Sequence, residues 1–191
     1  MALKLITAAT VLAVTLAEAK AHLRVDGADE DTLITALIGA ATQAAEQITG
    51  RALMAQTWEL TLDAFPAAVE LTRVPVQSIT SVSYADSTGA ATVLSPLLYA
   101  LDNADDFGWA YVVPVYAGAW PATRDEINAV KLRYVAGYAD AASVPAAVKS
   151  WILLAVGTLY ESRESETVGN GSAISLGFAD RLLDRYRVYS A

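Results

Sequence analysis

The spacing of hydrophobic residues changes twice along this chain. Between residues 29 and 49 they recur every three or four positions, which is the period of a helix packed on one face. Between 57 and 63 they alternate strictly with polar residues, which is the period of a half-buried strand. After Pro145 the helical spacing returns. Because each period suits one kind of element, we expect an α+β fold with helices on both sides of a β region.

Four helices are predicted outside the β region. Thr15 and Glu18 have the spacing of a capping box, and Gly50 has the position of a glycine that ends a helix. The helix that begins at Pro145 is apolar nearly all round, which is typical of a helix buried on most sides. We therefore expect a fold that is mainly a bundle of four helices. Their expected ranges are 15–24, 29–49, about 145–160 and about 178–187.

The β region is expected to form a small antiparallel subdomain inserted between the helices. Residues 86–89 have the composition of a hairpin turn between two of its strands. No internal repeat is visible, so we expect a single domain over 1–191, with a helical core at 1–55 and 144–191 and the β insertion at 56–143. The strands are expected at 57–63, 78–85, 91–94, 99–102, 110–113 and 129–135.

Composition argues against several classes of function. The formal net charge of −8 disfavours a protein that binds nucleic acid through its phosphates. The chain has no cysteine, which excludes disulfides, thiolate nucleophiles and cysteine-ligated zinc. No apolar run reaches the ~18 residues that a membrane span requires, so we expect no membrane partner. The first residues resemble a signal peptide, but the capping box at Thr15 favours a retained helix.

No combination of residues predicts a catalytic site. The only histidine, His22, lies on an expected helix, where a packing or surface role is the ordinary one. Segment 173–177 lacks the first glycine, the preceding strand and the following histidine of a nucleophile elbow. Asp102, Asp105 and Asp106 are better explained as a solvated turn than as a metal site. We expect no enzyme activity, no metal and no cofactor.

Aromatic and charged residues indicate candidate surfaces for partners. Trp109 and Trp120 lie near turns and belong either to the core or to contacts between subunits, where aromatic residues are enriched. Glu161, Glu164 and Glu166 form the densest acidic group near a loop. The C-terminus concentrates arginine in an acidic chain, which suits either a helix end or an arm that docks on a partner. The residues of this arm are Arg181, Arg185, Tyr186, Arg187, Val188 and Tyr189.

A series of short segments resembles the head–tail connector (adaptor) family of tailed phages, including the adaptors of gene transfer agents. The segments follow one another in the family's order over nearly the whole chain, and this order is more specific than any segment alone. They read TLAEAKAHLRVD at 15–26, DEDTLI at 29–34, TGRAL at 49–53, QTWEL at 56–60, VPVQSITSV at 74–82, WP at 120–121, VKLRYVAGY at 130–138, VPAAVK at 144–149 and LYESRE at 159–164.

The resemblance implies a structural protein at the head–tail junction of a virion or phage-like particle, synthesised in the bacterial cytoplasm. It implies a homo-oligomeric ring, usually of twelve copies, between the portal protein and a tail-side head-completion (stopper) protein. DNA would pass through the centre without specific binding. The C-terminal segment contacts the portal in related connectors, which would assign portal binding to the arm defined above.

Two further expectations accompany this interpretation. Glu161, Glu164 and Glu166 are expected on or near the channel side of such a ring, because negative charge lowers the affinity for DNA phosphates. The alternatives are another head-completion or tail-terminator protein, and a hydrolase that uses the carboxylates near residues 161–177.

Overall fold

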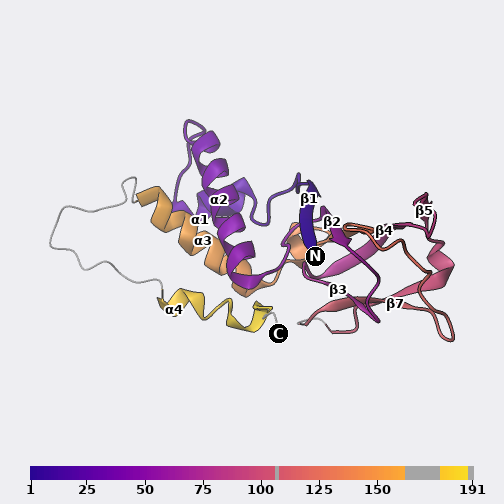
Figure 1. Ribbon diagram of the computed structural model, residues 1–191. Helices are drawn as coiled ribbons and strands as arrows, with labels where there is room; N and C mark the ends of the chain where they lie inside the picture. The colour runs from indigo at the N-terminus through magenta and orange to yellow at the C-terminus, as the bar shows by residue number, and fades with distance from the viewer. Residues whose placement is uncertain (106–107, 162–176, 189–191) are drawn as a thin grey trace. The chain divides into compact units, whose positions relative to one another are not determined.

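The protein divides into two compact units, drawn in Figure 1 from a computed structural model that describes residues 1–105, 108–161 and 177–188. The β unit comprises residues 1–10 and 54–139. The helical unit comprises residues 11–53 and 140–191. The chain therefore begins in the β unit, enters the helical unit, returns to the β unit and ends in the helical unit.

The larger sheet of the β unit is antiparallel and has five strands in the order β1-β2-β8-β4-β5. In its central strand, β8, Leu132 and Tyr134 have no exposed surface, as their alternation with polar residues predicted. Leu60 of β2 and Val82 of β4 both lie opposite Leu132 and are also buried, so the core of this unit lies on one face of the sheet. The strands are β1 (Ala2–Thr7), β2 (Gln56–Leu62), β4 (Val76–Ala85), β5 (Ala91–Val93) and β8 (Val130–Ala136).

A smaller antiparallel sheet of three strands completes the β unit, in the order β3-β7-β6. Val69 of β3 and Val112 of β7 lie opposite each other, and neither has exposed surface. A 3₁₀ turn, η1 (Pro96–Leu98), leads into β6. The strands of this sheet are β3 (Val69–Leu71), β6 (Tyr99–Asp102) and β7 (Ala110–Pro114).

Gly137 allows strand β8 to end close against residue 54. Its φ of +109° lies in a region that favours glycine, and a Cβ there would lie 2.0 Å from the carbonyl oxygen of Met54. The Gly137 N–H donates to the carbonyl of Pro75 at 2.8 Å, and Gln77 Nε2 donates to the Gly137 carbonyl at 2.7 Å. A side chain at position 137 would therefore displace backbone.

Three helices pack side by side in the helical unit: α1 (Leu16–Leu23), α2 (Asp31–Thr49) and α3 (Ala146–Glu161) (Figure 1). Ile34 and Ile38 of α2 and Ile152 of α3 have no exposed surface, so these faces form the core of the unit. The predicted capping box of α1 is confirmed, and α2 ends at Gly50 with a φ of +73°, as its position predicted. No helix among the described residues is long and apolar enough to cross a membrane.

The expected bundle of four helices is wrong. Within the described residues only α1, α2 and α3 have eight residues or more. The helix expected at about 178–187 is one α-helical turn, α4 (Gly177–Asp180), followed by a 3₁₀ turn, η3 (Asp184–Tyr186). After α4 the backbone bonds within this segment reach three residues back instead of four, as where the Leu183 N–H donates to the Asp180 carbonyl at 3.0 Å, so the segment continues as 3₁₀ turns. It ends where the Val188 N–H donates to the Thr49 carbonyl at the end of α2.

The β part is also larger than the small subdomain expected, since its described residues form two antiparallel sheets with eight strands. Two of these strands were not predicted. Residues 2–7 (ALKLIT) form β1, whose apolar residues do not alternate because both faces of this edge strand are largely exposed. Strand β3 has three residues, which is too short to show a period.

Candidate functional site

The C-terminal segment lies docked on the helical unit along residues 179–188, which we call the C-terminal arm. Ala179 and Leu183 are buried, with 1% and 0% of their surface exposed. The indole Nε1 of Trp151, on α3, donates a hydrogen bond to Asp180 Oδ1 at 2.9 Å. One face of the arm is thus held against α3 by an apolar contact surface and a hydrogen bond to a charged acceptor.

A buried arginine holds the far end of the arm. Arg51, which follows the end of α2, has 1% of its surface exposed, and its Nε donates to the carbonyl oxygen of Tyr186 at 2.7 Å. The Val188 N–H donates to the Thr49 carbonyl at 2.8 Å, and a Cβ on Gly50 would lie 3.3 Å from the Val188 carbonyl oxygen. A buried guanidinium is strongly unfavourable unless acceptors surround it, so Arg51 stabilises the docked position of the arm.

The other face of the arm is exposed and rich in charge. Arg181, Asp184 and Arg185 are exposed, and Arg187 is half-buried with its Nε 3.3 Å from Asp184 Oδ1. Of the predicted arm residues, Tyr186 and Val188 are half-buried, while Tyr189 lies outside the described residues. The structure therefore brings the predicted arginines together on a docked segment.

Sequence reasoning missed Arg51. It lies one residue beyond the glycine that ends α2, in a stretch with no apolar period, and its acceptor is a backbone carbonyl 135 positions away in the chain. A backbone acceptor leaves no trace in residue type, so no local pattern could have identified this contact. The one feature visible in the sequence is the position of this arginine, directly after a helix terminus in the TGRAL segment.

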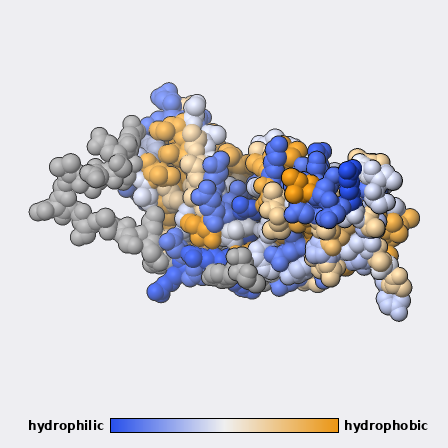
Figure 2. Space-filling view, in the orientation of Figure 1, coloured by the Kyte–Doolittle hydropathy of each residue, from blue (hydrophilic) through white to orange (hydrophobic). Residues whose placement is uncertain are grey.

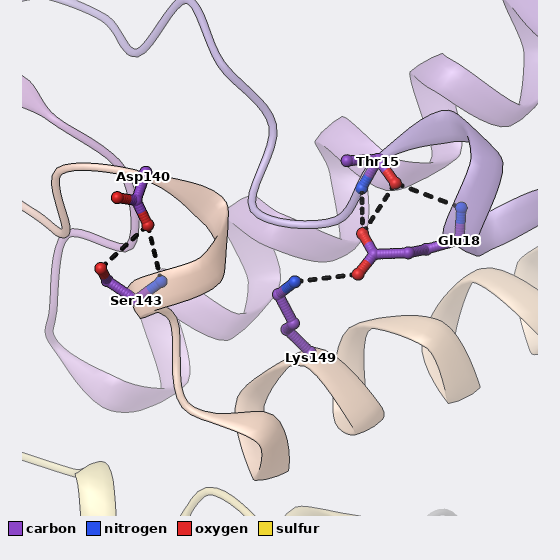
Figure 3. A network of polar contacts seen from close by, with 5 residues as sticks. All are labelled: Thr15, Glu18, Asp140, Ser143 and Lys149. Carbon is purple, nitrogen blue, oxygen red and sulfur yellow. Dashed lines mark hydrogen bonds and ion pairs between the residues drawn. The ribbon is translucent and has the colours of Figure 1, made fainter.

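A polar network joins the start of α1 to α3 (Figure 3). The Thr15 N–H donates to Glu18 Oε2 at 2.7 Å, and Lys149 Nζ on α3 lies 2.9 Å from Glu18 Oε1. The bond from the Thr15 backbone, then that from Lys149 and that from the Thr15 hydroxyl, lower the pKa of Glu18 from 4.5 to about 2. A carboxylate with so low a pKa is a poor proton acceptor at neutral pH, so this network is structural.

The same view shows how the turn before α3 is fixed. The hydroxyl and the N–H of Ser143 donate to Asp140 Oδ1 at 2.9 and 2.8 Å, which closes the 3₁₀ turn η2 (Ala141–Ser143). These two bonds lower the pKa of Asp140 below its ordinary value. Asp140 thus caps the turn in its charged form.

The other candidate residues are distributed over both units. Trp120 stacks on Phe65 with 4.6 Å between ring centroids, and both Trp120 and Trp109 are half-buried in the β unit. Glu161 is exposed at the end of α3, whereas Glu164 and Glu166 lie outside the described residues. In residues 1–105, 108–161 and 177–188, no group of three His, Cys, Asp or Glu side chains could hold a metal ion.

Large apolar side chains are exposed in the β unit. Val93, Leu97, Tyr116 and Ile127 are each at least 70% exposed. Figure 2 shows hydrophobic surface alternating with hydrophilic surface on the face drawn. Single exposed apolar residues are ordinary, whereas contiguous exposed apolar patches are typical of contact surfaces.

Comparisons with known proteins match part of the chain to one family model and the whole chain to one fold. Residues 13–88 match the family model described as phage gp6-like head-tail connector protein. The fold is similar to a chain in the virion of a native gene transfer agent (GTA) particle, with 24% sequence identity and a TM-score of 0.81 over 100% of this chain and 97% of that chain. A chain in the neck of an empty GTA particle computed with C6 symmetry gives 25% identity, a TM-score of 0.81 and the same coverage.

A third similar chain comes from the neck of a native GTA particle computed with C12 symmetry, with 23% identity and a TM-score of 0.72 over 100% of this chain and 97% of that one. The search of curated proteins found no match. The family match and the neck structures confirm the resemblance to head–tail connectors that the ordered sequence segments indicated.

Proposed function

We propose that the chain is a structural connector (adaptor) subunit at the head–tail junction of a phage or phage-like particle, because residues 13–88 match the connector family model and the whole chain has the fold of a GTA neck chain. The observation that carries the proposal is the likeness to a GTA neck chain, at 25% identity over 100% of this chain. The chain acts as one connector domain over residues 1–191 and is synthesised in the bacterial cytoplasm.

The subunit works as one of a ring of identical copies, twelve in number. Support comes from the C6 and C12 symmetry of the necks that contain similar chains. A closed ring uses a heterologous contact, in which one surface of a copy meets a different surface of the next. The exposed apolar residues of the β unit and the half-buried Trp109 and Trp120 are candidates for these contacts.

The ring joins the portal protein on one side to a tail-side stopper protein on the other. The C-terminal arm binds the portal through Arg181, Arg185 and Arg187 with Tyr186, Val188 and Tyr189. Exposed arginines in a chain of net charge −8 support this assignment, since they can pair with carboxylates on a neighbour.

DNA passes through the centre of the ring without specific binding. The negative net charge supports this role, because it provides few phosphate contacts. Glu161, Glu164 and Glu166 lie on or near the channel wall in this proposal, and Glu161 is exposed at the end of α3. The proposal includes no catalytic role, and Glu18, whose pKa is lowered to about 2, serves a helix cap.

The proposal is tested by negative-stain electron microscopy of the purified protein alone and mixed with the portal protein of the same particle. We expect ring-shaped complexes attached to the portal, because heterologous contacts close only when neighbours are correctly placed. A protein that forms no ring alone and does not associate with the portal would overturn the proposal.

A further inference from the structure

We propose that Arg51 is a positioning residue that keeps the C-terminal arm docked on the helical unit while the arm's exposed arginines bind an acidic surface of the portal. The inference rests on the proposed function for the identity of the partner. Beyond that function, Arg51 sets the position of the arm, the portal surface is acidic, and the arm binds this surface while docked.

The first step is the burial of the guanidinium. Arg51 is the largest side chain of the described residues that is fully buried, and its Nε bonds to the Tyr186 carbonyl at 2.7 Å. If the arm left the helical unit, this acceptor would leave with it. A hydrogen bond from a charged donor is stronger than one between neutral groups, so departure of the arm is opposed by loss of the bond between Arg51 and Tyr186.

The second step is that contacts hold the arm along its length. Asp180 accepts from Trp151 at one end, Leu183 is buried in the middle, and Val188 donates to Thr49 at the other end. These contacts involve both α3 and the end of α2. Binding that required an extended arm would have to break all of them, whereas binding to the docked arm breaks none.

The third step is the chemistry of the exposed face. The charged residues of the arm are three arginines and two aspartates, in a chain whose net charge is −8. One aspartate is engaged by Trp151 and the other lies beside Arg187, while Arg181 and Arg185 are exposed. Arginine forks bind carboxylates with defined geometry, and a docked segment presents them without further ordering. The complementary surface on the portal is acidic.

A disulfide that locks the arm tests whether it binds while docked. A Cβ at position 50 would lie 3.7 Å from the Val188 Cβ, which is within the ordinary range for a disulfide, and the chain has no cysteine of its own. Gly50→Cys with Val188→Cys therefore gives a single possible pair. A side chain at Gly50 is strained by its φ of +73°, so the reduced form of the same double variant is the matched control.

We expect the oxidised and reduced double variant to bind the portal with dissociation constants within about threefold of each other, because the lock fixes a position that binding already uses. Intact mass measures formation of the disulfide. Loss of portal binding on oxidation, restored by reductant, would show that the arm must undock and would overturn the inference.

The role of Arg51 is tested by Arg51→Met, which keeps a long side chain but removes the charge and the donor. We expect faster hydrogen exchange at the Val188 amide, a largely unchanged circular dichroism spectrum and portal affinity at least about tenfold weaker. Arg51→Lys keeps the charge and is expected to restore only part of the affinity, because it loses the directed Nε bond. Unchanged affinity together with an unprotected Val188 amide would contradict the positioning role.

The matched comparison is Arg181→Ala with Arg185→Ala. This variant is expected to weaken portal binding, and to reduce its dependence on salt, without changing exchange at the Val188 amide. If the wild-type protein binds no portal, the proposed function fails, and protection of the Val188 amide in wild type and Arg51→Met then decides the positioning role alone.

Discussion

The hydrogen bonds that join secondary-structure elements inside the β unit differ in kind from those inside the helical unit. In the β unit, backbone bonds join strands that are far apart in the chain, as where β2 pairs with β8. In the helical unit the backbone bonds of α1, α2 and α3 lie inside each helix, so side chains join these three helices to one another. Lys149 of α3 binds Glu18 of α1, and Tyr160 of α3 donates to Glu30 beside α2. The strands of a sheet are fixed by their hydrogen-bond register, whereas these helices are fixed by apolar packing together with polar side-chain contacts.

Burial of polar groups follows the same division. Among the described residues, the helical unit buries the side chains of Thr49 and Arg51. In the described part of the β unit, Gln56 is the one buried polar side chain other than tyrosine. The β unit depends on packing of apolar and aromatic residues such as Leu60 and Tyr134. The two units should therefore respond differently to loss of volume, loss of a hydrogen bond and change of pH.

The largest effect is expected from cavities in each core. Leu60→Ala in β2 and Ile38→Ala in α2 each remove a side chain with no exposed surface, which lowers the free energy of unfolding by about 2–5 kcal/mol. Hydrogen exchange should accelerate mainly in β2 and β8 for the first variant, and mainly in α2 and α3 for the second. Equal acceleration in both units for either variant would show one cooperative unit and remove the distinction.

Alkaline pH should affect the β unit through Tyr134. Burial raises the pKa of Tyr134 from 10.0 to about 12, so its neutral form contributes stability that is complete below pH 10 and is lost as pH rises through about 12. The contribution is at most about 3 kcal/mol. Tyr134→Phe should remove this part of the pH dependence, measured by urea unfolding between pH 8 and pH 12 relative to wild type.

Replacing one tryptophan in each unit by phenylalanine should change the free energy of unfolding by different amounts. Trp151→Phe removes the bond to Asp180 and should lower the free energy of unfolding by about 2 kcal/mol, because the acceptor is charged. Trp58→Phe in β2 is the matched control, since within the described residues Trp58 Nε1 has no hydrogen-bond partner. We expect a change below about 1 kcal/mol for the control. A larger loss for Trp58→Phe in urea unfolding would contradict the comparison.

The smallest effect is expected from acid and concerns the helical unit. The pKa of Glu18 is lowered to about 2, so its charged form contributes stability that is present above pH 4.5 and is lost as pH falls through about 2. The side chain is 42% exposed, and screening by water limits the contribution to about 1 kcal/mol. Glu18→Gln should lose this amount at pH 7 and become as stable as wild type near pH 2, measured by thermal unfolding.

The sequence predicted the elements whose pattern is local. The helices α1, α2 and α3 and the strands β2, β4 and β8 lie close to their expected ranges, because each repeats one period over seven or more residues. The capping box and Gly50 mark helix ends through single residue types. The predicted fourth helix failed because its backbone bonds reach three residues back instead of four, and the contacts that hold the segment at the end of α2 are not visible in any window of sequence.

The candidate site was predictable only in part. An arginine-rich end is visible in composition, and it led to the arm. Its docked state depends on the buried Leu183 and on Arg51, whose acceptor is 135 positions away in the chain. Whether Trp109 and Trp120 contact neighbouring subunits, and whether the arm binds a portal, stay predictions.

The helical unit is built from two segments, residues 11–53 and 140–191, and most of the β unit lies between them in the sequence. The order of synthesis therefore separates the two halves of the helical unit in time. Helix α2 leaves the ribosome with the faces of Ile34 and Ile38 uncovered, and α3 follows only after the whole β unit has been made. At ~5–20 residues per second this interval lasts several seconds or more. The C-terminal arm is made after α3 and supplies an acceptor for Arg51. A chain that stops early therefore keeps an exposed apolar face and an incompletely bonded cation, features that chaperones and proteases recognise before such a chain could enter an assembly.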